Sequence, residues 1–351
     1  MKLSLHLDSG YFQTEGAFFG LCLGDALART HTYKNPSFLL HGATGTWFLS
    51  VAQTLTMAQS NSIQEELALK LQVLSAPFHA LALRSKDPSL GQTLKKVAEQ
   101  YARCHEVKSS ATEAINADIL PCLIPLVFLN RSPGERMDAF AQVVTCTHIH
   151  PRVILSGALL VGSLLALAES NSQSLEEVLD KGQTFALTAA SVFSLPSFAK
   201  QALLHHVALG KGVSDPSDLG FPYGFDGRDS PEQLVVLALA LSEQSEFSTQ
   251  AILHDVIERG GASDILAPLL GGILGFRRGV GAFPAALRNL LLGQSVWWET
   301  LSLYNPRVSH KSTSINLVEE EIKLSFHEDA LLKAEGSISS TSSATQQLAF
   351  F

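Results

Sequence analysis

The chain has 351 residues, with 33 Asp and Glu against 25 Lys and Arg, so its formal net charge is −8. Hydrophobic residues make up 46% of the chain and charged residues only 17%, which excludes disorder over most of its length because this much apolar surface can form a core. The acidic balance, without a cluster of Lys and Arg, excludes nucleic acid as the main partner.

Targeting signals and paired cysteines are scarce in this sequence. The N-terminal stretch lacks the apolar region of a signal peptide, and Asp8 interrupts the few apolar residues it has. The four cysteines are scattered and include no C-x-x-C pair, which is typical of a protein in a reducing compartment. They are Cys22, Cys104, Cys122 and Cys146. We therefore expect a cytoplasmic protein.

Ala- and Leu-rich segments with helical periodicity follow one another along the chain, while alternation with the period of a strand is scarce. The sequence therefore predicts an all-α fold. The predicted helices cover residues 16–27, 47–58, 64–74, 112–129, 136–146, 153–168, 175–192, 233–241, 249–258 and 264–275. Residues 215–229 are rich in Gly, Pro and Asp, and we expect a long loop there that lines a site.

Residues 153–168 form the most apolar run of the sequence. A membrane span needs about 20 apolar residues, whereas this run is shorter and contains Ser156 and Ser163. We interpret it as a fully buried central helix of a single domain, and we expect no membrane partner.

The composition changes near residue 305. Residues 1–304 are predicted to form one globular, multi-helix domain, and residues 305–351 a C-terminal extension that is largely disordered. The serine-rich stretch 337–345 cannot build a packed core. Residues 317–324 could form a short peripheral helix or strand.

Glycines recur every four residues near both ends of the predicted domain. Gly16, Gly20 and Gly24 form one ladder, and the second follows at Gly271, Gly275 and Gly279. Positions four apart lie on one face of a helix, and a glycine there costs about 1 kcal/mol relative to alanine. The ladders therefore favour close packing of two helices, with a backbone that faces a ligand as the alternative.

Four stretches with this order and spacing resemble the ADP-ribosylglycohydrolase family. The first is the glycine ladder that ends in Gly24-Asp25-Ala26, which is similar to the family's GxxxGxxxGDAxG helix. Thr147-His148 with Pro151 is similar to its TH-x-x-P segment, and residues 120–125 stand where the family has an MRxxP motif. Residues 260–265 and the second ladder are similar to its GGDxDT block. The resemblance covers about residues 15–290.

This resemblance implies an all-α fold with a cleft that holds two Mg²⁺ ions, which help to cleave a glycosidic bond to ADP-ribose. The family takes carboxylate ligands from a Thr-Asp-Asp-Thr stretch and from the C-terminal Asp-x-Asp-Thr. Residues 43–47 should match the first stretch but contain no acid, and residues 26–64 contain no Asp or Glu at all. In the C-terminal block Ala262 and Ile265 replace an aspartate and a threonine, and Cys122 replaces the arginine of the middle motif.

The residues left as candidates for a metal or cleft site are few. They are Asp25, Thr44, Thr46 and Asp264. Asp25 could equally be an internal hydrogen-bonding residue, and we expect Asp264, together with Ser263, to cap a helix N-terminus. Such a set would bind at most one weak Mg²⁺, so no cofactor is expected. Candidate contacts to an anionic ligand are Arg29, His31, Lys34, His41 and Ser263.

Other chemistry finds little support in the sequence. The group Cys146, His148 and His150 lacks the spacing of a zinc site, and we interpret His148 as packing at a turn between helices. His205 and His206 are interpreted as a half-exposed helix surface.

The favoured hypothesis is a non-catalytic family member that binds an ADP-ribose-like or phosphate-containing molecule, or a protein partner. The alternative is a glycohydrolase with a reduced metal site that uses Asp25 and Asp264. A third hypothesis is a scaffold role, which would draw on an apolar surface that includes Phe18, Phe19, Trp297 and Trp298.

Overall fold

The structure is a computed structural model that describes residues 3–30, 43–57, 63–74, 93–170, 173–212, 230–291 and 304. Over these residues the fold is all-α, as predicted, without a β-strand; one isolated β-bridge joins Thr112 and His148. The helices are α1 (Leu3–Thr30), α2 (Ala43–Met57), α3 (Ile63–Leu74), α6 (Thr93–Cys104), α7 (Val107–Ser110), η2 (Leu120–Phe128), α8 (Pro133–Thr147), α9 (Pro151–Glu169), α10 (Leu175–Val192), α11 (Ser197–Gly212), α12 (Pro231–Glu243), α13 (Thr249–Arg259), α14 (Ser263–Arg278), η5 (Val280–Ala282) and α15 (Ala285–Leu290).

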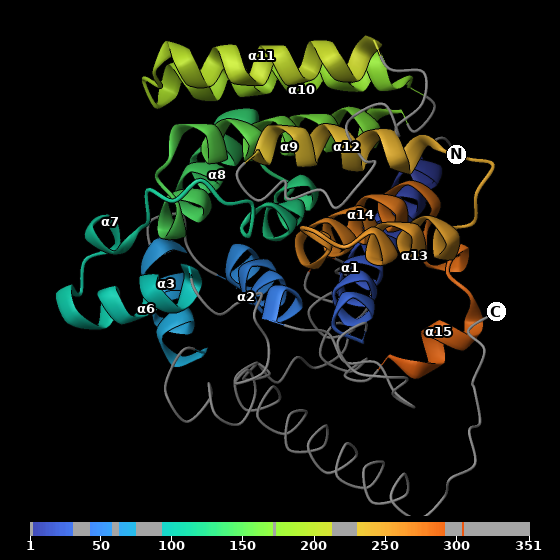
Figure 1. The fold of residues 1–351 in the computed structure, drawn as a ribbon, viewed down its shortest axis with the longest axis horizontal. Coiled ribbons are helices and arrows are strands. Elements are labelled where there is room, and N and C mark those ends of the chain that lie inside the picture. Colours follow the sequence, from blue (N-terminus) through green and yellow to red (C-terminus); the bar gives the residue numbers. More distant parts are fainter. Residues whose placement is uncertain are drawn as a thin grey trace, which may run out of the picture.

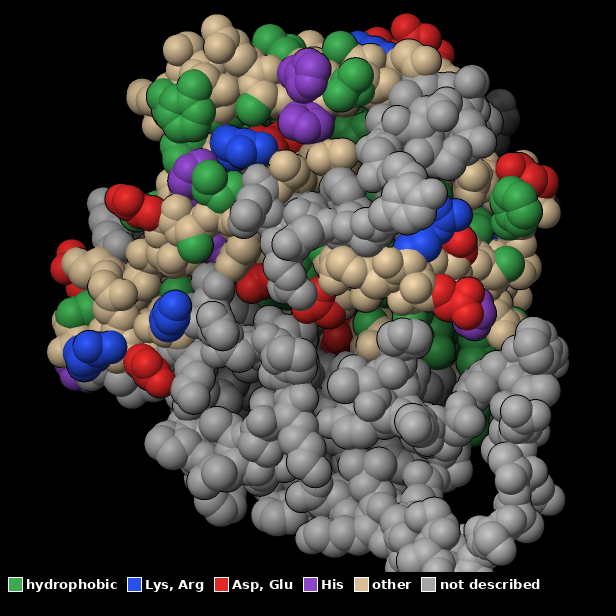
Figure 2. All heavy atoms as spheres, viewed as in Figure 1, with side chains coloured by type: hydrophobic (Ala, Val, Ile, Leu, Met, Phe, Trp, Pro, Cys, Tyr) green, Lys and Arg blue, Asp and Glu red, His purple; other side chains and the backbone are tan. Residues whose placement is uncertain are grey.

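The helices are stacked in layers. Helices α10 and α11 form an outer layer, α9 and α12 lie beneath it, and α14 packs below α12 and against α1 (Figure 1). The surface of the outer layer carries hydrophobic and histidine side chains (Figure 2). On α11 these include His206, which is half-buried, and His205, which is exposed, in agreement with the predicted half-exposed helix surface.

Local sequence signals explain where several of these helices begin. The side chains of Ser132 and Ser174 each accept a hydrogen bond from the backbone N–H three residues later. The carboxylates of Glu135 and Glu177 in turn accept from the backbone N–H of these two serines, so α8 and α10 start with capping boxes. A proline occupies the first helical position of α8, α9 and α12, where its missing N–H costs nothing.

Helix α9 is the central buried helix that the sequence predicts. Nearly all of its residues between Val153 and Leu167 are buried, including Ser156 and Ser163. Ser156 donates a hydrogen bond to the carbonyl oxygen of Arg152, and Ser163 donates one to that of Val178. By length and composition α9 is the one described helix that could cross a membrane, but 78% of its apolar window is buried within the protein.

The helix predicted over residues 112–129 is wrong in its first half and in its type. Residues near Thr112 are extended, and a 3-10 helix, η2, follows only at Leu120. Pro121 and Pro125 each lack a backbone N–H, and a proline inside an α-helix also clashes with the carbonyl four residues before it. Despite a change of helix type, the segment is buried from Leu120 to Val127, as its apolar composition requires.

The two glycine ladders face each other along α1 and α14. A Cβ atom on Gly16 would overlap the carbonyl oxygen of Gly275, one on Gly20 that of Gly271, and one on Gly24 that of Ala267. The first of the two predicted roles is therefore the observed one: the glycines let two helix backbones touch. Their pairing also shows that α1 and α14 run antiparallel.

The apolar surface expected for a scaffold role is not found at Phe18 and Phe19. Phe18 and Phe19 are 0% and 1% exposed, so they belong to the core and offer no surface to a partner. Phe18 packs edge-on against Phe48 at a centroid distance of 4.8 Å. Trp297, Trp298, the predicted loop 215–229 and the extension 305–351 lie outside the described residues. The predicted helix ranges do not include α6, α7 or α15, and of α11 the sequence predicts only a helix surface around His205 and His206.

Candidate functional site

One end of the α1–α14 pair brings together most of the candidate site residues that the structure describes. Because the two helices are antiparallel, the C-terminal end of α1, with Asp25, lies at the same end as the start of α14, with Asp264. Helix α2 begins at this end too, because the backbone N–H of Gly45 donates a 2.7 Å hydrogen bond to Oδ2 of Asp25. We call this region the α1–α2–α14 corner.

Asp25 stabilises the N-terminus of α2 from a different helix. Its side chain is 1% exposed, and Gly45 lies in the first turn of α2, which has no acidic residue of its own. The first turn of a helix leaves backbone N–H groups without helical partners, and its positive dipole end favours a carboxylate. A capping role across 20 residues of sequence therefore accounts for the burial of this aspartate.

The residues around Asp25 supply thiols and hydroxyls. Cys122 is fully buried, and its Sγ lies 3.8 Å from the carbonyl oxygen of Thr44, to which it donates. Burial, with a smaller contribution from the charge of Asp25, raises the pKa of both Cys22 and Cys122 well above the usual thiol value, so both remain neutral. Thr46 is buried, and its carbonyl oxygen accepts a 3.0 Å hydrogen bond from Oγ of Ser50.

The start of α14 differs from the sequence expectation. The residue at the N-cap is Ala262, which makes no side-chain capping bond, so the predicted capping role of Ser263 and Asp264 is wrong. Both residues instead lie in the first turn of the helix and are half-buried. An acidic residue in the first turn still interacts favourably with the helix dipole.

The described residues do not fit a pair of Mg²⁺ ions. Two such ions need hard oxygen ligands, mostly carboxylates, that converge from several elements. Within the described part of the chain, no three His, Cys, Asp or Glu side chains come together in a group that could hold a metal ion. At the corner Asp25 already accepts the Gly45 N–H, and residues 44–46 carry no carboxylate.

The turn between α8 and α9 holds a buried histidine. His148 is 0% exposed; its Nδ1 lies 2.9 Å from Oγ1 of Thr147 and its Nε2 lies 2.6 Å from Oδ1 of Asn116. Because the amide oxygen only accepts, Nε2 carries the proton and Nδ1 accepts from the threonine hydroxyl. The observed packing at a helix–helix turn is the role that we expected for this residue.

Lowering the pH should destabilise the protein through His148. Burial lowers the pKa of His148 from 6.5 to about 3, so between these values the unfolded chain binds a proton that the folded chain does not. Stability present at neutral pH is therefore lost as the pH falls below 6.5, by about 2 kcal/mol between pH 7 and pH 5. Urea unfolding at the two pH values measures the loss. The loss of stability between the two pH values should be about 2 kcal/mol smaller in His148→Gln, and it should be unchanged in the exposed control His205→Gln. A loss in His148→Gln as large as that of the parent protein would contradict the role of His148.

A buried ion pair next to this turn was missed by the sequence reasoning. Nε and Nη2 of Arg152, near the start of α9, donate 2.8 Å hydrogen bonds to Oε1 and Oε2 of Glu232, near the start of α12. Glu232 is 0% exposed. The partners are 80 residues apart, so no local pattern predicts them.

The cationic residues expected to contact an anionic ligand have side chains outside the described residues. The backbone of Arg29 lies in the last turn of α1, three residues beyond Ala26, the last buried residue of that helix, while its side chain is outside the described residues. His31, Lys34 and His41 also lie outside them.

Comparisons with known proteins identify the family of this chain. The family model for ADP-ribosylglycohydrolase matches residues 12–313. The chain belongs to the ADP-ribosylglycohydrolase family. No curated protein sequence matches it. Among solved structures, an "ADP-ribosylglycohydrolase-related protein complex" has a chain with the same fold, at 17% sequence identity and a TM-score of 0.59, and the alignment covers 85% of this chain and 98% of that one.

Residues 43–47, which the sequence resemblance matches to the family's first acidic stretch, lie in the first turns of α2. Residues 260–265, which it matches to the family's C-terminal block, lead into the first turn of α14.

Proposed function

We propose that this ADP-ribosylglycohydrolase-family protein is a non-catalytic binding or regulatory protein for an ADP-ribose-like, phosphate-containing small molecule. The observation that carries the proposal is the 2.7 Å hydrogen bond from the N–H of Gly45 to the carboxylate of Asp25. The buried carboxylate of Asp25 caps α2, and residues 43–47, which follow it, carry no acid that could serve as a metal ligand. The proposal therefore needs no metal cofactor.

The charged residues that follow Asp25 in the sequence favour an anionic ligand. Directly after Asp25, residues 26–64 contain no acid but carry Arg29, His31, Lys34 and His41. In addition, the first turn of α14 contributes Ser263 and has an N-cap, Ala262, without a side-chain acceptor. Cationic side chains and the N-terminal end of a helix both favour phosphate groups.

Calorimetric titration of the full chain with ADP-ribose tests the proposal. We expect saturable binding that EDTA does not change, together with no release of ADP-ribose from an ADP-ribosylated protein in excess Mg²⁺. Arg29→Ala should weaken the binding, because it removes a positive charge from a residue four positions after Asp25 on α1. The control Arg259→Ala alters an arginine of the α13 surface that pairs with Asp255, and it should bind like the parent protein.

Two results would overturn the proposal. The first is Mg²⁺-dependent hydrolysis that disappears in Asp264→Ala, which would establish the alternative function, a glycohydrolase with a rebuilt metal site. The second is the absence of binding to ADP-ribose, its component nucleotides and inorganic phosphate.

A further inference from the structure

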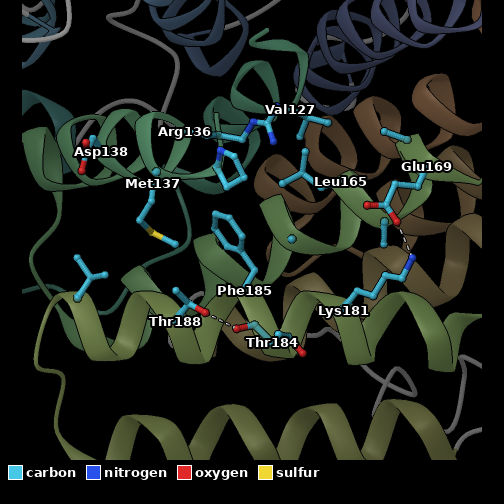
Figure 3. Close-up of a pocket in the computed structure, with 16 residues that line it drawn as sticks. Val127, Arg136, Met137, Asp138, Leu165, Glu169, Lys181, Thr184, Phe185 and Thr188 are labelled. Carbon is cyan, nitrogen blue, oxygen red and sulfur yellow. Dashed lines mark hydrogen bonds and ion pairs between the residues drawn. The ribbon is translucent and has the colours of Figure 1, made fainter. Parts of the chain in front are cut away.

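A cavity of about 910 Å³ opens between α8, α9 and α10, far along these helices from the His148 turn. Its walls come from the first turn of α8, the last turns of α9 and the second half of α10 (Figure 3). Its volume lies within the roughly 300–1,000 Å³ of pockets that bind small molecules. The cavity is thus separate from the α1–α2–α14 corner, and the inference drawn from it does not depend on the proposed function.

The cavity is lined mainly by apolar side chains. Val127 and Leu165 line one side, and Met137 and Phe185 approach from α8 and α10 (Figure 3). Phe185 is only partly buried although it packs against the core, with its ring 6.3 Å from that of Phe140. Such walls favour a ligand with an apolar body, because its transfer from water is favourable in proportion to the area covered.

Two cationic side chains line this cavity, and only one of them pairs with a carboxylate. Nζ of Lys181 forms a 2.6 Å ion pair with Oε2 of Glu169, so the positive charge of Lys181 is already neutralised. Arg136 has no carboxylate partner among the described residues: its Nη2 donates to the carbonyl oxygen of Leu129 at 2.9 Å, and its buried Nε has no hydrogen-bond partner there. Asp138, the remaining acid of the lining, is exposed and lies away from Arg136 (Figure 3).

Arg136 is therefore a partly desolvated cation without a compensating charge. Burial lowers the pKa of its guanidinium, and no acidic neighbour opposes this shift. An anion that entered the cavity would relieve this cost, and a carboxylate matches the planar fork of a guanidinium better than other small anions of single charge.

We propose that the α8–α9–α10 cavity binds a linear monocarboxylate with an apolar chain, whose carboxylate pairs with Arg136 while its chain lies against Leu165 and Phe185. A nucleotide is a poorer match, because it carries several charges and polar sugar groups, whereas the described lining offers one uncompensated cation and mostly apolar walls.

Titration of the full chain with decanoate and with decanol tests the proposal, because the two probes share an apolar chain and differ in charge. We expect saturable binding of decanoate at a single site and binding of decanol that is at least roughly tenfold weaker, the usual effect of a hydrogen bond to a charged group. In Arg136→Met the two probes should bind equally, because this change removes the charge and keeps an apolar side chain of similar length.

Two further variants complete the test. Lys181→Met with Glu169→Gln is the matched control: it removes an ion pair without net charge from the cavity lining, so it should change the affinity for decanoate less than about threefold. Thr188→Trp adds a large ring to an exposed position of the cavity wall and should abolish the binding of both probes without disturbing the core. Should Arg136→Met fail to fold, Thr188→Trp and the comparison of the two probes decide. Equal binding of decanoate and decanol to the parent protein, no saturable decanoate binding, or unchanged binding in Thr188→Trp would overturn the proposal.

Discussion

Replacing Gly20 by alanine is expected to lower the free energy of unfolding by about 3 kcal/mol or more, the upper range for overpacked positions. The added Cβ would overlap the carbonyl oxygen of Gly271, and the end of the Phe283 ring lies 2.8 Å from its position. A backbone atom cannot turn aside as a flexible side chain can, so α1 and α14 would have to separate. Urea unfolding followed by circular dichroism measures the loss.

Gly134→Ala is the matched control for this variant. Gly134 lies in the exposed first turn of α8, and a Cβ there would meet no atom within 4 Å. Alanine should therefore be neutral or stabilise the protein by a few tenths of a kcal/mol, up to about 1 kcal/mol. If Gly20→Ala were as stable as Gly134→Ala, the close contact of the two backbones would be refuted.

Replacing Arg152 by leucine is expected to cost about 3–5 kcal/mol of folding free energy. The change leaves Glu232, which is 0% exposed, as a buried carboxylate without the two 2.8 Å hydrogen bonds from the guanidinium. Chemical unfolding at neutral pH measures the cost.

The double variant Arg152→Leu with Glu232→Leu separates the interaction from the cost of an isolated charge. Replacing both partners by apolar residues removes the buried charge altogether, so the double variant should recover most of the stability lost in the single one. A double variant less stable than Arg152→Leu would show that the pair itself, and not the unpaired carboxylate, dominates the energy.

The sequence predicts those parts of the fold that depend on local patterns. Helix α9 was predicted because its residues are apolar all round, and α10 was predicted with its observed limits, from Leu175 to Val192. Close helix packing at the two glycine ladders was also predicted, but the pairing of Gly20 with Gly271 was not. The family resemblance, carried by four short motifs, agrees with the family model that matches residues 12–313.

Contacts between distant residues account for what the sequence could not predict. The bond between Asp25 and Gly45 and the pair of Arg152 and Glu232 join positions 20 and 80 residues apart, and no periodicity connects them. The difference over residues 112–129 has a local cause: Pro121 and Pro125 disfavour the α-helix that the apolar spacing of the segment predicts.

The contact between α1 and α14 has a consequence for the order in which the protein forms during synthesis. Gly16 meets Gly275, so the buried glycine face of the first helix gains its partner only after about 250 further residues have been made. At ~5–20 residues per second, translation of that interval takes roughly 10–50 s. Throughout this time the glycine face of α1 lacks the partner that covers it in the folded protein, whereas Phe18 meets its partner Phe48 as soon as α2 has been made.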